Sequence, residues 1–437
     1  MIFRMHFWAG SSLVLSLLML APTRCTAIDW LHYQPYPELD GRIVHEVLIF
    51  GNNHTNSFVV LREMRITEGV VFDSKDLWHD WERIVDLGLF ANVEVEAVAS
   101  GEGVLVVVSV YERPRWFAAP IVDYDLEEKE ITAGFRVHLR NVNGLNQQLR
   151  TKLVYGGRNS FTLNWSTPWL GKRRQSLDVD FGIDLPDPRE NVLRSSRFAI
   201  SATRFLGDFK VLRRGITPFV SIEVLRLEHS VPQLRINQLA PSIGIGYFRD
   251  SRNVRVDPQR GSFLSASGQY DVGWVTDDLT FIRSVLDGRK FVSFGSVVFA
   301  GRARTVLSRG EVPSYRKLGI GGPGSIRGQK QDVTYGDNIG LAAMELRFPL
   351  LPKRRFTLPL PFAPQRVRNF DLRLDGVLFA DAGASWDDTP ELRDATIFRG
   401  VGIGLRVFLP VLELARLEVA FDEEGRPTFY FREGNLI

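Results

Sequence analysis

One cation lies in a glycine-rich stretch that predicts a loop. Residues 321–329 have the sequence Gly-Gly-Pro-Gly-Ser-Ile-Arg-Gly-Gln. Glycine loses the most backbone entropy in a helix or strand, and proline lacks a backbone donor, so regular structure is disfavoured here. Arg327 is the one charge of this loop, and a guanidinium binds a carboxylate through two parallel hydrogen bonds. The candidate loop motif consists of Gly322, Gly324, Ile326, Arg327 and Gly328.

Two later segments offer carboxylates as partners for this arginine. Along residues 338–348 the apolar side chains share one face, which places Glu345 on the other face. The same alternation along residues 371–381 places Asp381 opposite the apolar side chains. If these segments are strands of a transmembrane barrel, both carboxylates face the lumen, because a charge facing lipid near the middle of the bilayer is costly. We therefore expect the loop to fold into the lumen, where Arg327 pairs with Asp381 or forms a triad that includes Glu345.

The region that supplies these segments, residues 116–437, alternates with a period of two. The pattern is clear in residues 131–140, 161–166, 177–184 and 401–409. An outward apolar face and an inward polar face are what a transmembrane antiparallel β-barrel requires, and candidate segments suggest about 16 strands. A soluble β-sandwich also alternates, but its polar face is the outer one. The number of repeats and the leader described next favour the membrane.

The first 27 residues are typical of a secretory signal peptide. Arg4 precedes an apolar run, and Cys25-Thr26-Ala27 fits a small-residue cleavage site. Beyond it, no apolar window reaches the ~18 residues of a transmembrane helix. Cys25 is the only cysteine, and the seven histidines lack paired ligand spacing, so we expect neither a metal nor a cofactor. A net charge of +3 is too balanced to indicate nucleic acid as a partner.

Residues 40–115 predict a small α/β domain that precedes the barrel. A β-rich run at 43–50 is followed by helical patterns at 58–66 and after Asp73, and Gly88 ends the second helix. Two further strands then alternate through residues 93–97 and 104–110. The predicted order is strand, helix, helix, strand, strand.

This domain resembles a POTRA domain. The resemblance lies in the element order, in Gly51-Asn52 after the first strand, and in Asp-Leu-Gly-Leu-Phe at 86–90. In that family such domains lie in the periplasm and receive client chains by β-augmentation, in which an extended peptide pairs with an exposed strand edge. The resemblance implies that residues 92–98 form this edge, with Val93, Glu94, Val95 and Glu96 as the client-binding residues. The alternative is a plain α/β domain without a client.

The barrel region resembles the BamA/TamA superfamily of outer-membrane assembly and secretion proteins. Ile-Arg-Gly-Gln at 326–329 is similar to the VRGY/F loop motif of that family, and Phe379 to Gly383 matches its F-x-D-x-G strand motif through Asp381. Residues 344–350, with Glu345, are similar to its glutamate-bearing strand. The three motifs occur in the family's order after a POTRA-like domain, so the resemblance extends from about residue 40 to the C-terminus. Two features depart from the family: a single POTRA-like domain, and a terminal Ile437 where an aromatic residue is usual.

The resemblance implies a non-enzymatic protein of the bacterial outer membrane with its N-terminal domain in the periplasm. Its expected partners are unfolded outer-membrane or secreted client proteins, membrane lipids and accessory periplasmic proteins. It would assist insertion or translocation of clients, while Arg327 and Asp381 would stabilise the barrel and its loop rather than catalyse a reaction. The alternatives are a secretion pore dedicated to one partner protein, a passive pore, and a barrel enzyme. The last lacks support, because His138 and His229 have no G-x-S-x-G or similar context.

Overall fold

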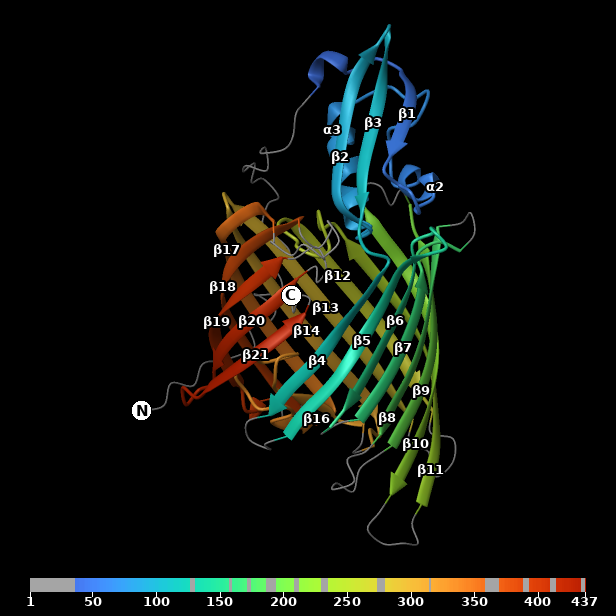
Figure 1. The fold of residues 1–437 in the computed structure, drawn as a ribbon. Helices are drawn as coiled ribbons and strands as arrows, with labels where there is room; N and C mark the ends of the chain where they lie inside the picture. Colours follow the sequence, from blue (N-terminus) through green and yellow to red (C-terminus); the bar gives the residue numbers. More distant parts are fainter. Residues whose placement is uncertain are drawn as a thin grey trace.

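The computed structural model consists of a small N-terminal domain and a large curved sheet (Figure 1). It describes residues 36–437 apart from 126–129, 157–158, 171–173, 186–193, 208–211, 229–234, 273–279, 314–315, 358–368, 388–392, 409–413 and 434–436. The predicted signal peptide, residues 1–27, lies outside the described residues. The predicted boundaries at 40–115 and 116–437 stay predictions, with β3 ending at Glu112 and β4 beginning at Trp116.

The N-terminal domain has the predicted order of elements. A short 3-10 helix, η1 (Pro37–Leu39), precedes β1 (Val44–Phe50), α2 (Ser57–Leu61), α3 (Ser74–Asp86), β2 (Phe90–Ser100) and β3 (Gly103–Glu112). The sheet order is β1-β3-β2, with β1 parallel and β2 antiparallel to β3. Alternate residues of β3 and the inner faces of both helices form its core, which includes Val59, Val60, Ile84, Val104, Val106 and Val108.

Local hydrogen bonds set the bounds of the two helices. The side chain of Asp73 accepts a hydrogen bond from the Lys75 amide at 2.8 Å, which is the expected N-cap of α3. Helix α2 is shorter than predicted. The fully buried Asp80 of α3 explains this, because its carboxylate accepts from the Arg65 and Ile66 amides at 2.9 Å each and holds this segment outside the helix.

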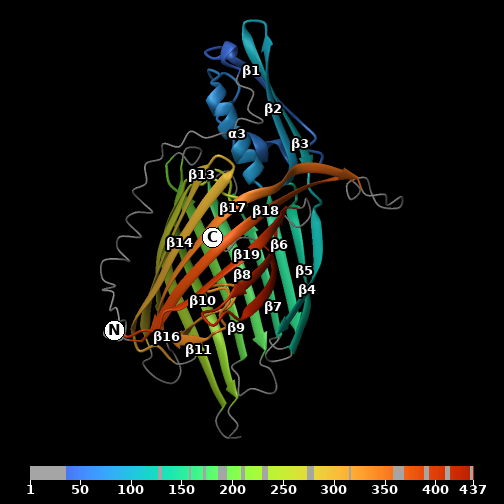
Figure 2. The same ribbon diagram turned by 90° about the vertical axis from the view of Figure 1, so that its left-hand side faces the viewer.

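The large sheet has 16 antiparallel strands, in agreement with the sequence-based estimate. Its order follows the chain from β4 to β21, except that β14 pairs directly with β17. Figures 1 and 2 show the sheet curving into the shape of a barrel, and β4 and β21 are the two terminal strands of this sheet. The strands are β4 (Trp116–Asp125), β5 (Glu130–Val142), β6 (Gln147–Tyr155), β7 (Asn159–Thr167), β8 (Gln175–Leu185), β9 (Arg194–Phe205), β10 (Arg213–Glu228), β11 (Arg235–Asp250), β12 (Gly261–Asp271), β13 (Phe281–Phe294), β14 (Val297–Gly310), β17 (Asn338–Thr357), β18 (Asn369–Trp386), β19 (Phe398–Phe408), β20 (Ala415–Phe421) and β21 (Pro427–Glu433).

The glycine-rich stretch lies in the long connection between β14 and β17. Two short strands of this connection, β15 (Leu318–Ile320) and β16 (Thr334–Gly336), pair with each other and form the base of the loop. Ile320 and Ile326 are fully buried and pack against Val306 of β14 and Ile339 of β17. The loop is therefore attached to the inner wall of the barrel by its apolar residues.

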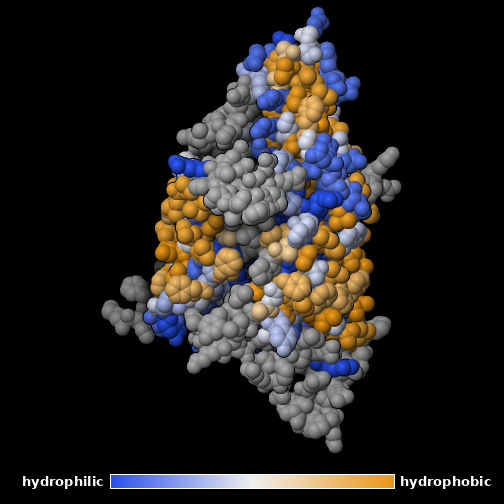
Figure 3. Space-filling view, viewed as in Figure 1, coloured by the Kyte–Doolittle hydropathy of each residue, from blue (hydrophilic) through white to orange (hydrophobic). Residues whose placement is uncertain are grey.

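The two faces of the barrel wall differ in polarity as the alternation predicts. Ile243 is 60% exposed and Ile403 is 56% exposed on the outer face, whereas Ser221 and Ser242 lie buried on the inner face and share a hydrogen bond. Figure 3 shows hydrophobic residues over much of the barrel wall and hydrophilic residues where the domain meets the barrel. Among the described residues, no helix is long and apolar enough to cross a bilayer.

Candidate functional site: an arginine-centred network in the barrel lumen

Arg327 forms a bidentate pair with Asp381. Its Nε donates to Oδ2 at 2.7 Å and its Nη2 donates to Oδ1 at 2.9 Å. The Arg327 backbone amide adds a third hydrogen bond to Oδ2 at 3.1 Å. Both side chains have no solvent-exposed surface. The carboxylate of β18 therefore fixes both the side chain and the backbone of the loop at this residue.

A second edge of the same guanidinium contacts two glutamates from different strands. Arg327 Nη1 donates to Glu345 Oε1 of β17 and to Glu418 Oε1 of β20, at 2.9 Å in each case. The structure thus brings together the three residues expected from the sequence and adds Glu418. Because Glu418 lies two strands away from Asp381 in the sheet, one loop residue connects β17, β18 and β20.

Further arginines balance the charge of these carboxylates. Glu345 Oε2 accepts from Arg347 Nη2 at 2.8 Å and also from Arg406 of β19. Arg416 Nη1 lies 3.4 Å from Glu418 Oε1. Four guanidinium groups therefore accompany three carboxylates in a buried network (Arg327, Arg347, Arg406 and Arg416 with Glu345, Asp381 and Glu418). Removal of Arg327 would leave the buried carboxylate of Asp381 without its ion-pair partner.

The phenylalanine of the strand motif lies directly against the guanidinium. The Arg327 Cζ atom is 3.7 Å from the centroid of the Phe379 ring. Phe379 and Asp381 face the lumen together because they are two residues apart on β18. The ring covers one face of the guanidinium while the carboxylates bind its edge, so the planar cation is held by a cation–π contact as well as by hydrogen bonds.

Glycines of the wall make room for the loop. A Cβ atom on Gly400 of β19 would lie 1.8 Å from the Arg327 carbonyl oxygen. At Gly383, the last residue of the strand motif, it would lie 3.0 Å from Cδ1 of Ile326 and 2.6 Å from Cδ2 of Leu341. These close approaches explain why glycine is needed at these two wall positions.

The glycines of the loop motif differ in what they do. Gly322 and Gly328 have φ angles of 75° and 97°, a region that other residues adopt only with strain. Gly324 does not have a positive φ, and a Cβ atom added to it would meet no other atom within 4 Å. The expected motif residue Gly324 therefore has no steric role that the structure shows.

Two other contacts connect the loop to the C-terminal strands β19 and β21. The Gly328 amide donates to the Tyr430 hydroxyl of β21 at 3.1 Å, and Gln329 Nε2 donates to the Arg399 carbonyl at 2.7 Å. The motifs in the sequence do not predict the roles of Tyr430, Gly400 or Glu418. A signal for Glu418 is present, because the alternation within β20 places it on the polar face.

The predicted client-binding residues, Val93 to Glu96, lie on an edge strand. Strand β2 is the last strand of the domain sheet and pairs with β3 on one side. On its other side, the Val93 carbonyl accepts a hydrogen bond from the Trp81 indole of α3 at 2.8 Å. Helix α3 thus covers the start of this edge. The side chains of Glu94 and Glu96 are exposed.

The C-terminal residue is buried inside the barrel. Ile437 packs against Phe291, Ala300 and Ala343, which lie on β13, β14 and β17, and Figures 1 and 2 place the C-terminus within the barrel outline. The aromatic residues of the closing strand have the opposite orientation. Phe429 and Phe431 are 68% and 64% exposed on the outer face of β21.

Comparison with known families identifies this architecture. The sequence profile of the Omp85 superfamily domain matches residues 141–436, which is more than half of the chain. The chain belongs to the Omp85 superfamily. A second profile, for the surface antigen variable number repeat or POTRA unit, matches residues 43–113. The family predicted from the loop and strand motifs is thereby confirmed, with one POTRA domain before an Omp85 barrel.

Individual relatives agree with this assignment. The chain is 26% identical over 410 residues to the outer membrane protein assembly factor BamA of Nitratidesulfovibrio vulgaris. The aligned region covers 88% of this chain and 49% of the relative. It therefore spans about half the length of that curated relative. As an Omp85 barrel with a POTRA domain, the protein belongs to the bacterial outer membrane with its POTRA domain in the periplasm, as predicted.

Solved structures share the fold. BamA from Haemophilus ducreyi lacking POTRA domains 1–3 superposes with a TM-score of 0.50 at 16% identity, covering 90% of this chain and 83% of that one. CdiB from Escherichia coli superposes with a TM-score of 0.62 at 14% identity, covering 90% of this chain and 76% of that one. CdiB from Acinetobacter baumannii gives a TM-score of 0.57 at 12% identity, covering 90% and 73%. At these identities the likeness is one of fold.

Proposed function

We propose that this protein assists the insertion or translocation of client proteins at the outer membrane, and that its POTRA domain receives them along β2. The observation that carries the proposal is an edge strand in the periplasmic domain of an Omp85 barrel. An edge strand presents unpaired backbone groups to which an extended chain can add by β-augmentation. Unfolded outer-membrane proteins are rich in segments able to pair in this way.

The geometry of β2 defines which backbone groups a client would meet. The Val93 carbonyl points away from β3, because it accepts from Trp81. Backbone groups alternate along a strand, so Val95 and Ala97 direct their amide and carbonyl groups to the same side as Val93. The pairing surface therefore begins at Val95, beyond the part that α3 covers. Exposed Glu94 and Glu96 side chains flank it and favour client segments that carry lysine or arginine.

The lumenal network has a structural role in this proposal. Arg327 of the loop lies at the centre of this network. The carboxylates and the other guanidinium groups of the barrel wall are buried around it. Such a network stabilises one position of the loop and one arrangement of the C-terminal strands. It would stabilise the part of the wall that ends at β21, and we propose that client strands enter the membrane between the two terminal strands, β21 and β4.

Site-specific photo-crosslinking tests the predicted edge. A photoreactive residue at Glu94 on β2 is compared with the same residue at Glu46, an exposed position on β1 at the opposite edge of the sheet. We expect crosslinks from position 94 to an unfolded outer-membrane client, and none above background from position 46. Equal crosslinking from both positions, or from position 46 alone, would contradict client capture along β2.

A backbone variant separates pairing from simple proximity. Val95→Pro removes one outward amide donor without removing a hydrogen bond to β3, and edge strands tolerate proline. Val95→Ala is the matched control. It keeps the backbone amide that proline lacks, and its side chain is smaller than that of either valine or proline. We expect Val95→Pro to abolish the crosslink from position 94 and Val95→Ala to retain it. Loss in both variants would indicate side-chain recognition in place of β-augmentation.

A further inference from the structure

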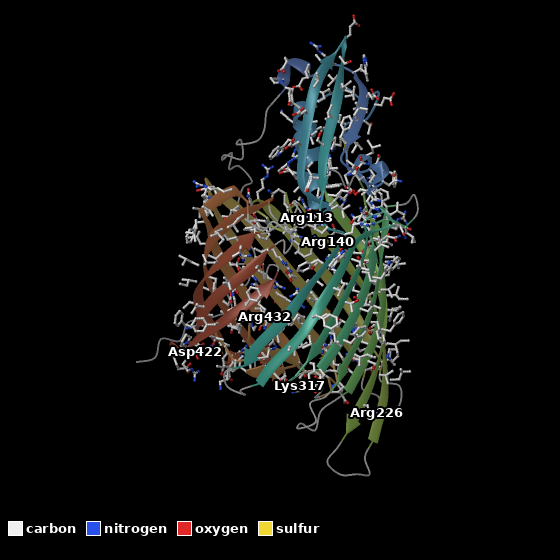
Figure 4. The ribbon with its side chains drawn as sticks, in the orientation of Figure 1. Arg113, Arg140, Arg226, Lys317, Asp422 and Arg432 are labelled. Carbon is white, nitrogen blue, oxygen red and sulfur yellow. The ribbon has the colours of Figure 1, made fainter. Side chains whose placement is uncertain are left out.

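The POTRA domain rests on the periplasmic connections of the N-terminal half of the barrel. At the β5–β6 connection, the Asn56 amide donates to the Gly144 carbonyl at 3.0 Å. At the β7–β8 connection, the Trp169 ring packs edge-on against Phe58 of α2 with 6.0 Å between centroids. Figure 4 shows Arg113 and Arg140 at this junction between domain and barrel. These contacts hold the α2 side of the domain.

Helix α3 is held by arginines from two further connections. The carboxylate of Asp86 lies 2.5 Å from Arg213 Nη1 at the start of β10. It also accepts from the amide and Nε of Arg255 in the β11–β12 turn, at 2.7 and 2.9 Å. One helical turn earlier, Glu82 accepts from Arg260 Nη2 of the same turn at 2.7 Å. Asp86 is almost fully buried here, so this contact forms part of a packed interface.

The β11–β12 turn also reaches into the barrel mouth. Its Asp257 accepts a hydrogen bond from Arg373 Nη2 of β18, and its Gln259 carbonyl accepts from Ser293 Oγ of β13 at 2.7 Å. Arg373 Nη2 also donates a hydrogen bond to Asp375 Oδ2 of the same strand at 2.6 Å, which orients the guanidinium. Burial works against the charged form of Asp257, but the charge of Arg373 outweighs it and holds the pKa of this carboxyl below its usual range. The β11–β12 turn therefore contacts both the POTRA domain and strand β18 of the barrel wall.

Strand β18 contacts both the β11–β12 turn, through Arg373, and the loop, through Asp381. Arg373 and Asp381 lie on its lumenal face, eight residues apart, and Asp381 binds Arg327 of the loop. We propose that the β11–β12 turn couples the POTRA domain to the loop: docking of α3 on Arg255 and Arg260 holds Asp257 against Arg373, and so stabilises β18 where Asp381 binds Arg327. Displacement of the domain from the turn then loosens the loop. This inference does not depend on any client.

Hydrogen–deuterium exchange of the full-length protein in lipid tests the coupling. Asp86→Ala removes the POTRA end of the contact, and the arginines that its carboxylate binds lie in the barrel, so the core of the domain is left intact. Asp257→Ala removes the lumenal end. We expect each variant to accelerate amide exchange at residues 326–329 roughly three- to thirtyfold, the range of typical coupling between distant sites. The double variant should exchange no faster than the faster single variant.

A control variant and a second interface variant show whether the effect is specific to the contact between α3 and the β11–β12 turn. Lys75→Ala, at an exposed position at the other end of α3, should leave loop exchange at the wild-type rate. Glu82→Gln removes only one charge and replaces Asp86→Ala if that variant fails to fold. Faster exchange confined to residues 252–260, with residues 326–329 unchanged, would overturn the coupling. Multiplicative effects in the double variant would also overturn it, because the two ends would then act independently.

Discussion

At the scale of single residues, Arg327 is the point on which the loop and the wall depend. It has no exposed surface, three carboxylates bind its edge, and Phe379 covers one of its faces. Lysine cannot reproduce this arrangement, because an ammonium is a compact charge without the planar set of donors that binds a carboxylate at two points. The chemistry of the site is therefore specific to arginine.

Replacement of this residue tests its contribution to stability. We expect Arg327→Ala to destabilise the barrel by about 3–5 kcal/mol, because Asp381 remains buried without its partner and Glu345 and Glu418 each lose one of theirs. Arg327→Lys should recover only part of this loss. Urea unfolding in detergent micelles gives the measurement, with Arg426→Ala as the control because Arg426 is exposed in the β20–β21 turn, beside the Asp422 labelled in Figure 4. Equal stability of Arg327→Ala and the control would contradict this role.

A pair of glycine substitutions tests how closely the loop approaches the wall. Gly400→Ala should shift the loop, because the added Cβ would lie 1.8 Å from the Arg327 carbonyl, and we expect a cost of about 1–3 kcal/mol. Gly324→Ala meets no atom within 4 Å and should change stability by less than about 0.5 kcal/mol. Thermal unfolding of both variants is the measurement. A larger effect at Gly324 than at Gly400 would show that the loop lies elsewhere.

At the scale of elements, the sequence predicts well which face of a strand each side chain lies on. It predicts poorly which distant residues that side chain contacts. Alternation identifies the faces on which Glu345 and Asp381 lie, because strand parity is a local property. The contacts of Glu418 and Tyr430 with the loop are not predicted, because they depend on where β20 and β21 lie in the sheet relative to the loop. Gly400 escapes it for the same reason, since its need for glycine arises from a loop about 70 residues earlier in the chain.

The length of α2 shows the same limit at a smaller scale. Its apolar pattern continues to Ile66, but Asp80 of the next helix binds the Arg65 and Ile66 amides and ends the helical conformation early. A tertiary hydrogen bond thus overrides the local pattern. The signal peptide and the client-binding role of β2 remain predictions from the sequence and the family resemblance.

The contact of α3 with the barrel has a defined pH dependence. Burial disfavours the charged form of Glu82, but hydrogen bonds from His79 and Arg260 outweigh it, so its pKa lies below the ordinary value of 4.5. A depressed pKa means that the stabilisation is complete above pH 4.5 and is lost as the pH falls through the lower native value.

A single substitution isolates this contribution from other carboxylates. At pH 7 we expect Glu82→Gln to lower the unfolding free energy of the POTRA domain by about 1 kcal/mol, as for a partly exposed ion pair. The difference from wild type should be smaller at pH 3 than at pH 7, because the stabilisation is lost as the pH falls through the depressed pKa of Glu82. Urea unfolding followed by the fluorescence of Trp78 and Trp81 measures it at both pH values. A difference that stays constant or grows in acid would contradict the depressed pKa.

At the scale of the whole molecule, two sets of contacts hold different parts of the barrel. The POTRA domain rests on connections between β5 and β12, and the loop binds strands from β17 to β21. Strands β4 and β21 are the two ends of the sheet, and no pairing joins them among the described residues (Figure 1). The two sets of contacts therefore hold different halves of the sheet.

The most direct test of the proposed function is client insertion by the reconstituted protein. Lipid vesicles containing wild type, Val95→Pro or Val95→Ala are mixed with an unfolded outer-membrane client, and the protease-protected fraction is followed over time. We predict faster insertion with wild type and Val95→Ala than with empty vesicles, and a fall to the empty-vesicle rate with Val95→Pro. Insertion at the empty-vesicle rate with wild type, in vesicles that conduct ions, would contradict the proposal and indicate a passive pore or a channel for a single partner.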